Sequence, residues 1–178
     1  LGVAAGSEAI KTSKLRQIAS GGLYGDDGVV WVDSFRIDLA RMIIRASTTP
    51  IVVVYEYSFQ LEALRALYPE APVLGDGQRF VQKDLDKWSR RTVPVLFMHV
   101  RSAAHGLNLQ YGGHTLLVIT PVWGADPWQQ VIGRLCRRGQ PSDEVVVHQI
   151  LASGTNDMRF RDRLDDKADA EQSMMGLL

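Results

Sequence analysis

Short, nearly continuous apolar runs alternate along this chain with segments in which apolar residues recur every three or four positions. The runs are rich in β-branched residues, which is typical of strands buried on both faces of a parallel sheet. They are residues 29–32, 50–55, 71–74, 93–100, 114–120 and 144–151. The helical period is found in residues 7–20, 35–47, 58–69, 78–91 and 126–138. Because strands that alternate with helices form right-handed βαβ units, the pattern predicts an α/β fold, a three-layer sandwich around a mainly parallel central sheet.

Capping and turn residues predict where the helices begin and how the chain is divided. Ser34 and Ser58 are predicted N-caps, and Asp126 is a predicted N-cap with Pro127 at the first helical position. A Gly-Gly pair at 21–22 ends the first helix. The predicted division is a helical lead-in at 1–25, an α/β lobe at 26–154, and a charged C-terminal helix with its tail at 155–178.

Composition limits the classes of protein that fit this pattern. The chain has 178 residues, enough for one domain with a substantial core, and is formally neutral with 20 basic and 20 acidic residues. Neutrality argues against nucleic-acid binding by bulk charge, although it does not exclude a local basic strip. The single cysteine, Cys136, favours a reducing, cytoplasmic compartment. No apolar run approaches the roughly 18 residues that span a membrane, so we expect no membrane contact. The absence of an initiator Met suggests a piece of a longer polypeptide.

The segment QVIGRLCRRGQ, residues 130–140, carries the strongest chemical signal. It places Arg134 and Arg137 three residues apart, on one face if the segment is helical, with Gln130 one turn before Arg134. Two guanidinium groups side by side suit a phosphate, because each offers a rigid fork of donors. The simpler alternative is a solvated basic helix.

Ligands of an open parallel sheet bind outside the carboxyl ends of its strands. We therefore expect the loops after residues 93–100 and 114–120 to carry the chemistry, and the two arginines to project toward that edge. The first of these loops, RSAAHGLNLQ at 101–110, contains small residues that allow a ligand or a backbone to approach closely. The alternative is a tight turn between a strand and a helix.

Taken in order, several segments resemble the motifs of one family. GLNL at 106–109 resembles motif V, residues 130–140 resemble motif VI, and VVVYEYSFQLEAL at 52–64 resembles motif IV. LRQ at 15–17 and LGDG at 74–77 also have counterparts, although Gly75 interrupts the second. The chain thus resembles the C-terminal RecA-like lobe (a P-loop NTPase-like fold) of the Swi/Snf-type ATPases of helicase superfamily two, in a compact bacterial or phage form.

The resemblance implies roles for specific residues. Arg134 and Arg137 would be catalytic, acting on the γ-phosphate of ATP. The residues implied near the nucleotide are Gly106, Asn108, Gln130 and Gln140. Those implied along the nucleic acid are Tyr57, Ser58, His99, Arg101, Ser102 and Ala103. Where relatives often carry a hydroxyl before the small residues, this chain has His99-Val100, so the phosphate contact would fall to His99, Arg101 or Ser102.

Two motifs of a complete ATPase are missing. The sequence contains no G-x-x-x-x-G-K-[ST] loop and no acidic D-E-x-x motif after a strand. ATP and Mg²⁺ would therefore be held mainly by an N-terminal RecA-like lobe of the same polypeptide, and we expect this chain alone to be inactive. The resemblance implies translocation on double-stranded DNA in the cytoplasm of a bacterial or phage-infected cell.

Other readings stay open. The chain could be a non-catalytic RecA-like module that binds nucleic acid or a partner protein, or half of a nucleotide-sugar transferase. A basic face is predicted in the segment 79–91, and its simplest interpretation is solvated surface. Trp123 and Trp128 are interpreted as packing residues rather than base-stacking platforms.

Overall fold

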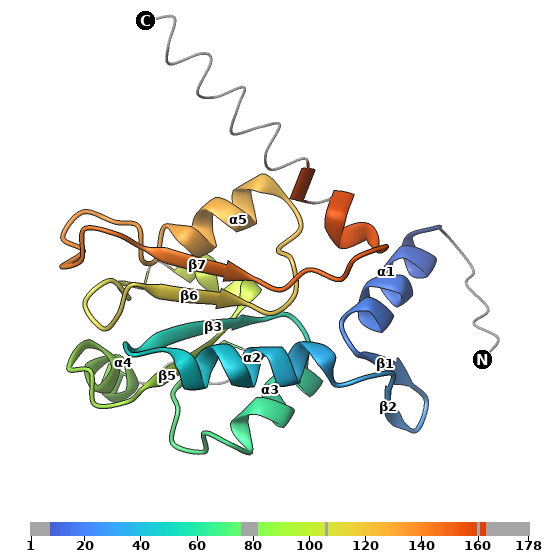
Figure 1. Ribbon diagram of the computed structural model, residues 1–178, viewed down its shortest axis with the longest axis horizontal. Helices are drawn as coiled ribbons and strands as arrows, with labels where there is room; N and C mark the ends of the chain where they lie inside the picture. Colours follow the sequence, from blue (N-terminus) through green and yellow to red (C-terminus); the bar gives the residue numbers. More distant parts are fainter. Residues whose placement is uncertain (1–7, 76–81, 106, 160, 163–178) are drawn as a thin grey trace, which may run out of the picture.

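The computed structural model describes residues 8–75, 82–105, 107–159 and 161–162. Its centre is a five-stranded sheet in the order β4-β5-β3-β6-β7, in which every neighbouring pair is parallel (Figure 1). The strands are β3 (Ile51–Tyr55), β4 (Val73–Leu74), β5 (Val95–His99), β6 (Thr115–Val118) and β7 (Val146–Gln149). The predicted α/β fold with a mainly parallel sheet is confirmed.

Helices cover both faces of this sheet and create two cores. On one face, α2 (Phe35–Ala46) and α3 (Ser58–Arg65) pack on alternate residues of the strands, including Val53 and Phe97. On the other face lie α4 (Gln82–Ser89) and α5 (Ala125–Ile132), which pack on Val52 and Leu96. The central strands are buried on both faces, which explains why their sequences are apolar runs rather than alternating patterns.

The predicted strand at 29–32 does not belong to the sheet. It forms β2 (Gly28–Trp31), which pairs antiparallel with β1 (Gly22–Gly25) in a separate hairpin and is largely exposed. The prediction was wrong in this respect because an apolar run indicates a strand but not its pairing partner. The hairpin follows α1 (Glu8–Ala19), the helix predicted at 7–20, and Trp31 packs edge-on against Phe59 of α3.

Several predicted helix boundaries also need correction. The N-cap of α3 is Tyr57 rather than Ser58, and that of α5 is Gly124 rather than Asp126. Ser34 is the N-cap of α2, as predicted. The largest difference is that α5 ends at Ile132, whereas the prediction extended to 138. A chain of turns follows, closed by a positive φ of 89° at Gly139.

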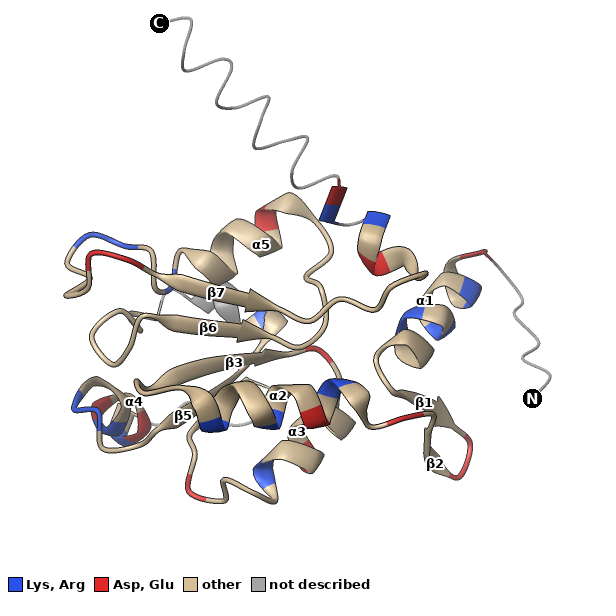
Figure 2. Ribbon diagram, in the orientation of Figure 1, with Lys and Arg blue, Asp and Glu red and all other residues tan. Residues whose placement is uncertain are grey.

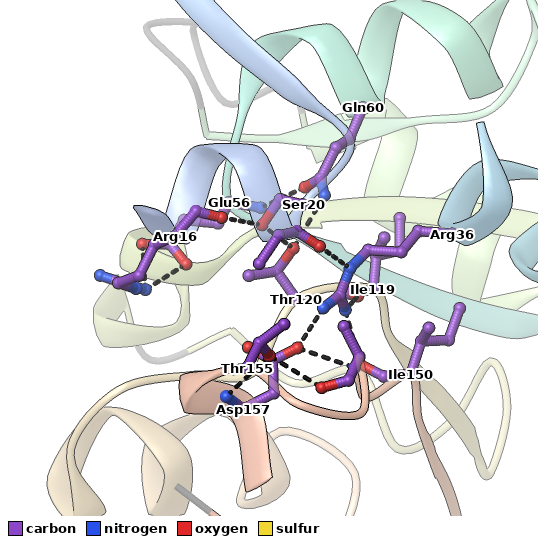
Figure 3. Close-up of polar contacts among 12 residues, drawn as sticks. Arg16, Ser20, Arg36, Glu56, Gln60, Ile119, Thr120, Ile150, Thr155 and Asp157 are labelled. Atoms are coloured by element: carbon purple, nitrogen blue, oxygen red, sulfur yellow. Dashed lines mark hydrogen bonds and ion pairs between the residues drawn. The ribbon is translucent and has the colours of Figure 1, made fainter. Parts of the chain in front are cut away.

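Buried polar residues fix α1 and the C-terminal segment to the sheet. Arg36 of α2, only 4% exposed, donates to the carbonyls of Ala19, Ile119 and Ile150 and forms an ion pair with Asp157 (Figure 3). These partners lie at the ends of α1, β6 and β7 and in the segment after β7. Asp157, at the start of the predicted C-terminal helix, is thus buried, with 3% of its surface exposed. Arg36 therefore contacts all three segments predicted from the sequence, 1–25, 26–154 and 155–178. The boundaries of these segments remain a prediction.

Candidate functional site

The carboxyl ends of the central strands surround a pocket of about 350 Å³. It lies where the loops after β3, β5 and β6 meet α1 and the first turns of α5. The lining residues are Arg16, Glu56, Val100, Arg101, Val122, Trp123, Pro127 and Gln130. Gln130 and Arg101, two of the predicted site residues, are thus brought to one place at the predicted edge of the sheet.

An ion pair between Arg16 and Glu56 occupies one side of this pocket. One terminal nitrogen of Arg16 lies 2.7 and 2.6 Å from the two carboxylate oxygens of Glu56. The same guanidinium stacks over the ring of Trp123, with its carbon 5.0 Å from the ring centroid. Burial raises the pKa of Glu56, and the charge and hydrogen bond of Arg16 oppose this shift. Arg16 thus favours the charged form of a carboxyl group whose burial favours the neutral form.

Replacing Arg16 by methionine should raise the pKa of Glu56 further, because the cation that favours the charged form is removed. Arg101→Met is a matched control, since Arg101 has the smallest of the effects on this carboxyl and should shift its pKa less. Titration of the Glu56 carboxyl by carbon-detected NMR measures its pKa in both variants. Equal shifts in the two variants would contradict this account of the pocket.

The raised pKa of Glu56 also predicts how its contribution to stability depends on pH. In wild type this contribution is fully present below about pH 4.5 and is lost as the pH rises through the raised pKa.

The side chains of His99 and Ser102 make contacts within the fold. His99 Nε2 lies 3.1 Å from the Glu56 carbonyl, and the Arg101 backbone N–H donates to Nδ1 at 3.3 Å, so both ring nitrogens have a partner within the fold. The Ser102 hydroxyl is buried against Gly75, where any side chain would collide with it. Gly75 also has a positive φ of 97°, which explains the glycine that interrupts the family spacing. Of the three residues predicted to contact phosphate, Arg101 is the one with an exposed side chain.

The predicted hydroxyl site at the start of α3 is covered by a tyrosine of the hairpin. The Tyr24 hydroxyl accepts from the Ser58 backbone N–H at 3.0 Å and lies 2.9 Å from the Ser58 hydroxyl. Tyr57 stacks on Phe59 at 5.3 Å, and burial raises the pKa of its phenol to about 12. A phosphate at Ser58 would have to displace Tyr24. Sequence reasoning missed Tyr24 because nothing in its local pattern reports a contact 34 residues away.

The two motif arginines come together beside the loop that follows β5. Arg137 Nη1 donates to the side-chain oxygen of Asn108 at 2.6 Å, and Arg134 Nη1 donates to the carbonyl of Leu107 at 3.4 Å. Gln140 anchors the end of the turn by donating to the carbonyls of Gly113 and Leu135. Residues from motifs V and VI, predicted to share a nucleotide, are therefore neighbours in the fold.

The charge of this arginine pair is not neutralised. Within the described residues, neither Arg134 nor Arg137 forms an ion pair with a carboxylate, and the buried Nε of Arg134 has no hydrogen-bond partner. Burial, and then the charge of Arg137, lower the pKa of Arg134. Two like charges placed together at a partly desolvated position would be stabilised by an anion bound to both.

The position of the pair differs from the prediction. α5 starts at the carboxyl edge and runs back across the sheet, and Gln140 then contacts Gly113, just before β6 begins (Figure 1). Arg134 and Arg137 therefore lie toward the amino ends of the strands, not at the open carboxyl edge. The prediction was wrong because the rule of carboxyl-end sites concerns loops that follow strands, whereas this motif is carried to the opposite side by a returning helix. Gln130 lines the pocket at the carboxyl edge, one turn before Arg134 in sequence.

The remaining predicted residues are placed only in part. Ala103 lies in η1 (Val100–His105), a 3₁₀ segment directly after β5, while Gly106 and residues 76–81 lie outside the described residues. Within the described ranges, no cluster of three or more His, Cys, Asp or Glu could hold a metal ion. No described helix is both long and apolar enough to cross a membrane. Acidic and basic segments are intermixed over the helices, and the loop between α5 and β7 carries both signs (Figure 2).

Comparison with known proteins shows the fold and one sequence relative. No family model matches the chain. Over 166 residues, 89% of this chain, it is 34% identical to the putative protein p41 of Acyrthosiphon pisum secondary endosymbiont phage 1, and it spans about a third (35%) of that protein's length. The C-terminal part of the Fun30 ATPase domain is similar with a TM-score of 0.62 and 16% identity, over 71% of this chain and 44% of that one. The helicase domain of Pyrococcus furiosus Hef is similar with a TM-score of 0.54 and 22% identity, over 73% and 28%. The chain therefore has the fold of a RecA-like lobe found in helicase ATPase domains.

Proposed function

We propose that this chain is the second lobe of a two-lobed, ATP-dependent DNA translocase of the Swi/Snf type. In this proposal Arg134 and Arg137 neutralise the γ-phosphate of an ATP molecule held, with Mg²⁺, mainly by an N-terminal lobe of the same polypeptide. The observation that carries the proposal is the un-neutralised arginine pair, which is bound to the loop of Leu107 and Asn108 and has no carboxylate partner among the described residues.

The chemistry of the pair suits a transferred phosphoryl group. Arg137 now donates to a neutral amide oxygen, and a charged phosphate oxygen would be a stronger acceptor for the same N–H. Arg134 lies beside it with an unused Nε. Such donors act on the charge that spreads over the phosphate oxygens as the bond to the leaving group breaks. Arg137, the more exposed of the two, is the proposed arginine finger, and Arg134 is its partner.

Nucleic acid would bind at a different place, the carboxyl edge with Arg101 and the pocket beside it. The proposal thus separates a nucleotide face from a nucleic-acid edge on one rigid lobe. ATP bound between two lobes would draw the nucleotide face toward the first lobe and tilt the nucleic-acid edge relative to it. Hydrolysis would release this tilt, and repeated closure and opening would move duplex DNA.

The purified chain should not hydrolyse ATP, because its sequence has no phosphate-binding lysine loop and its described residues form no cluster of three or more His, Cys, Asp or Glu that could hold a metal ion. Joined to an N-terminal lobe that carries both, it should form an ATPase stimulated by duplex DNA. The rate of phosphate release from ATP measures the turnover of both preparations. Turnover by the chain alone that survives Arg137→Ala would contradict the proposal. Absence of DNA-stimulated turnover after the lobes are joined would favour the alternative, a non-catalytic RecA-like module.

A further inference from the structure

Tyr111 is an exposed tyrosine in the turn that leads into β6, beside the arginine pair. It is 48% exposed and follows Asn108, the residue that accepts from Arg137, by three positions. A methyl group placed on Gly139 would lie 3.5 Å from the Tyr111 hydroxyl oxygen, so the ring borders the turn that also carries Arg137. The segment before β6 and the loop after α5 meet at the amino edge of the sheet (Figure 1). Tyr111 and the arginine pair therefore belong to one surface.

The backbone that carries Tyr111 is fixed to the core. Trp88, which is fully buried, donates from Nε1 to the carbonyl of Leu109 at 2.8 Å. Arg91 Nε donates to the carbonyl of Tyr111 itself at 3.4 Å. Gly112 lies so close to the indole of Trp88 that any side chain at this position would collide with it. The turn is thus held in place on both sides of Tyr111, while the tyrosine side chain stays outside the core.

Within the described residues, the ring of Tyr111 has no partner. Its hydroxyl forms no hydrogen bond, its ring contacts no other aromatic ring, and it belongs to neither core. Tyr24 and Tyr57, in contrast, take part in the aromatic contacts around Phe59. A tyrosine ring on a fixed backbone offers a flat contact surface at a low cost in conformational entropy. The ring is therefore available to a ligand.

An aromatic ring next to two guanidinium groups suits a ligand that is both aromatic and anionic. Guanidinium forks bind phosphate oxygens, and a nucleobase stacks on an aromatic side chain. Arg137 and Gly139 are two residues apart, which limits the distance between their Cα atoms to about 7 Å. One extended nucleoside triphosphate is long enough to contact both the Arg137 guanidinium and the ring beside Gly139. The combination matches a nucleotide better than inorganic phosphate or a protein carboxylate, either of which would leave the ring unused.

We propose that Tyr111 binds the base of the ATP molecule by stacking on its face, while Arg134 and Arg137 bind the phosphates. This inference rests on the proposed function of the arginine pair and adds a residue for the nucleoside. Stacking tolerates any base, because every base has a π-face, so Tyr111 contributes affinity rather than discrimination between bases. The base is at the opposite end of the nucleotide from the transferred phosphoryl group. Tyr111 therefore acts on the binding of ATP and not on the chemical step.

Calorimetric titration of the proposed two-lobed protein with a non-hydrolysable ATP analogue, and with tripolyphosphate, tests this assignment. Tyr111→Ala should weaken binding of the ATP analogue about 5- to 150-fold, the effect of removing one stack between a base and an aromatic ring. Its affinity for tripolyphosphate, which has the phosphates and no base, should equal that of wild type. Tyr111→Phe keeps the ring and should bind both ligands as wild type does. Unchanged binding of the ATP analogue by Tyr111→Ala, or an equal loss for both ligands, overturns the proposal.

Phe35→Ala is the matched control, because Phe35 is an aromatic residue, 79% exposed, on α2, which covers the opposite face of the sheet from α5. It should alter the affinity for neither ligand. Thermal unfolding checks that each variant is folded.

Steady-state kinetics separate this inference from the proposed function on which it rests. Tyr111→Ala should raise KM for ATP and leave kcat within about twofold of wild type, since it removes binding that is equal in the ground state and the transition state. A kcat that does not respond to Arg137→Ala contradicts the proposed function, and the calorimetric comparison still decides the role of Tyr111. A kcat that depends on Arg137, together with a KM that does not respond to Tyr111→Ala, overturns the stacking alone. Absence of any nucleotide binding by the two-lobed protein overturns both.

Discussion

In the proposed two-lobed translocase, Arg137→Ala should lower the DNA-stimulated ATPase rate by about 10³- to 10⁵-fold. This loss equals about 4 to 7 kcal/mol of transition-state stabilisation. The reason is that the guanidinium of Arg137 is exposed, is held only by Asn108 among the described residues, and can turn to the phosphate without disturbing the core. Steady-state phosphate release with saturating duplex DNA measures the effect.

Arg138→Ala is the matched control for this experiment. Arg138 is the next residue, is also exposed, and carries the same charge, but it makes no hydrogen bond or ion pair to another described residue. Its removal should change the rate only slightly, which separates the specific role of Arg137 from the effect of net charge. Equal losses in the two variants would mean that the segment acts as a general basic surface, the simpler interpretation of the sequence motif.

Asp157→Ala should destabilise the fold by about 3 to 5 kcal/mol, because it leaves the guanidinium of Arg36 buried without its counter-charge. Asp157 also accepts the backbone N–H of Ala152 at 3.0 Å, so a second, partly buried donor loses its partner. The loss should release the segment after β7 and weaken the attachment of α1, whose last carbonyl is bound by Arg36. Urea denaturation gives the change in the free energy of unfolding.

Asp143→Ala provides the control for charge removal, since Asp143 is exposed in the loop before β7. Its effect on the free energy of unfolding should stay within about 0.5 kcal/mol. If Asp157→Ala were no more destabilising than Asp143→Ala, the Arg36 network would not be what holds the three segments together.

The sheet could be predicted from sequence because its strands are buried on both faces. Residues such as Val52, Val53 and Val54 face different cores, so every position must be apolar, and the run stands out from the helices around it. The same logic failed for the strand around Trp31, where an equally apolar run lies in an exposed hairpin. Local pattern reports the burial or the conformation of a segment, but not the element that it pairs with.

The pattern of apolar and polar residues could not predict contacts between residues that lie far apart in the sequence. Arg36 looks like the polar residue of an amphipathic helix, yet its partners Ile119, Ile150 and Asp157 lie 83, 114 and 121 positions away. Tyr24 and Arg16 enter the site for the same reason, through a hairpin and a helix that precede the sheet. In contrast, the resemblance to the family motifs predicted that Arg137 and Asn108 lie near each other, and the structure brings these two residues together.

The separation of the two candidate sites changes the interpretation of the motifs. Arg101 and Gln130 lie at the carboxyl edge, whereas Arg134 and Arg137 lie toward the amino ends, although Gln130 and Arg134 are only one helical turn apart in sequence. The two sites are thus joined by α5 and the turns that follow it.

The affinity of the two-lobed protein for ADP with aluminium fluoride, compared with ADP alone, tests most directly whether the arginine pair binds the transferred phosphoryl group. A group that acts in the transition state contributes to binding of the analogue and little to binding of the product. The account predicts that Arg137→Ala leaves the affinity for ADP unchanged and weakens binding of the fluoride complex at least about a hundredfold. Unchanged affinity for both ligands would contradict it.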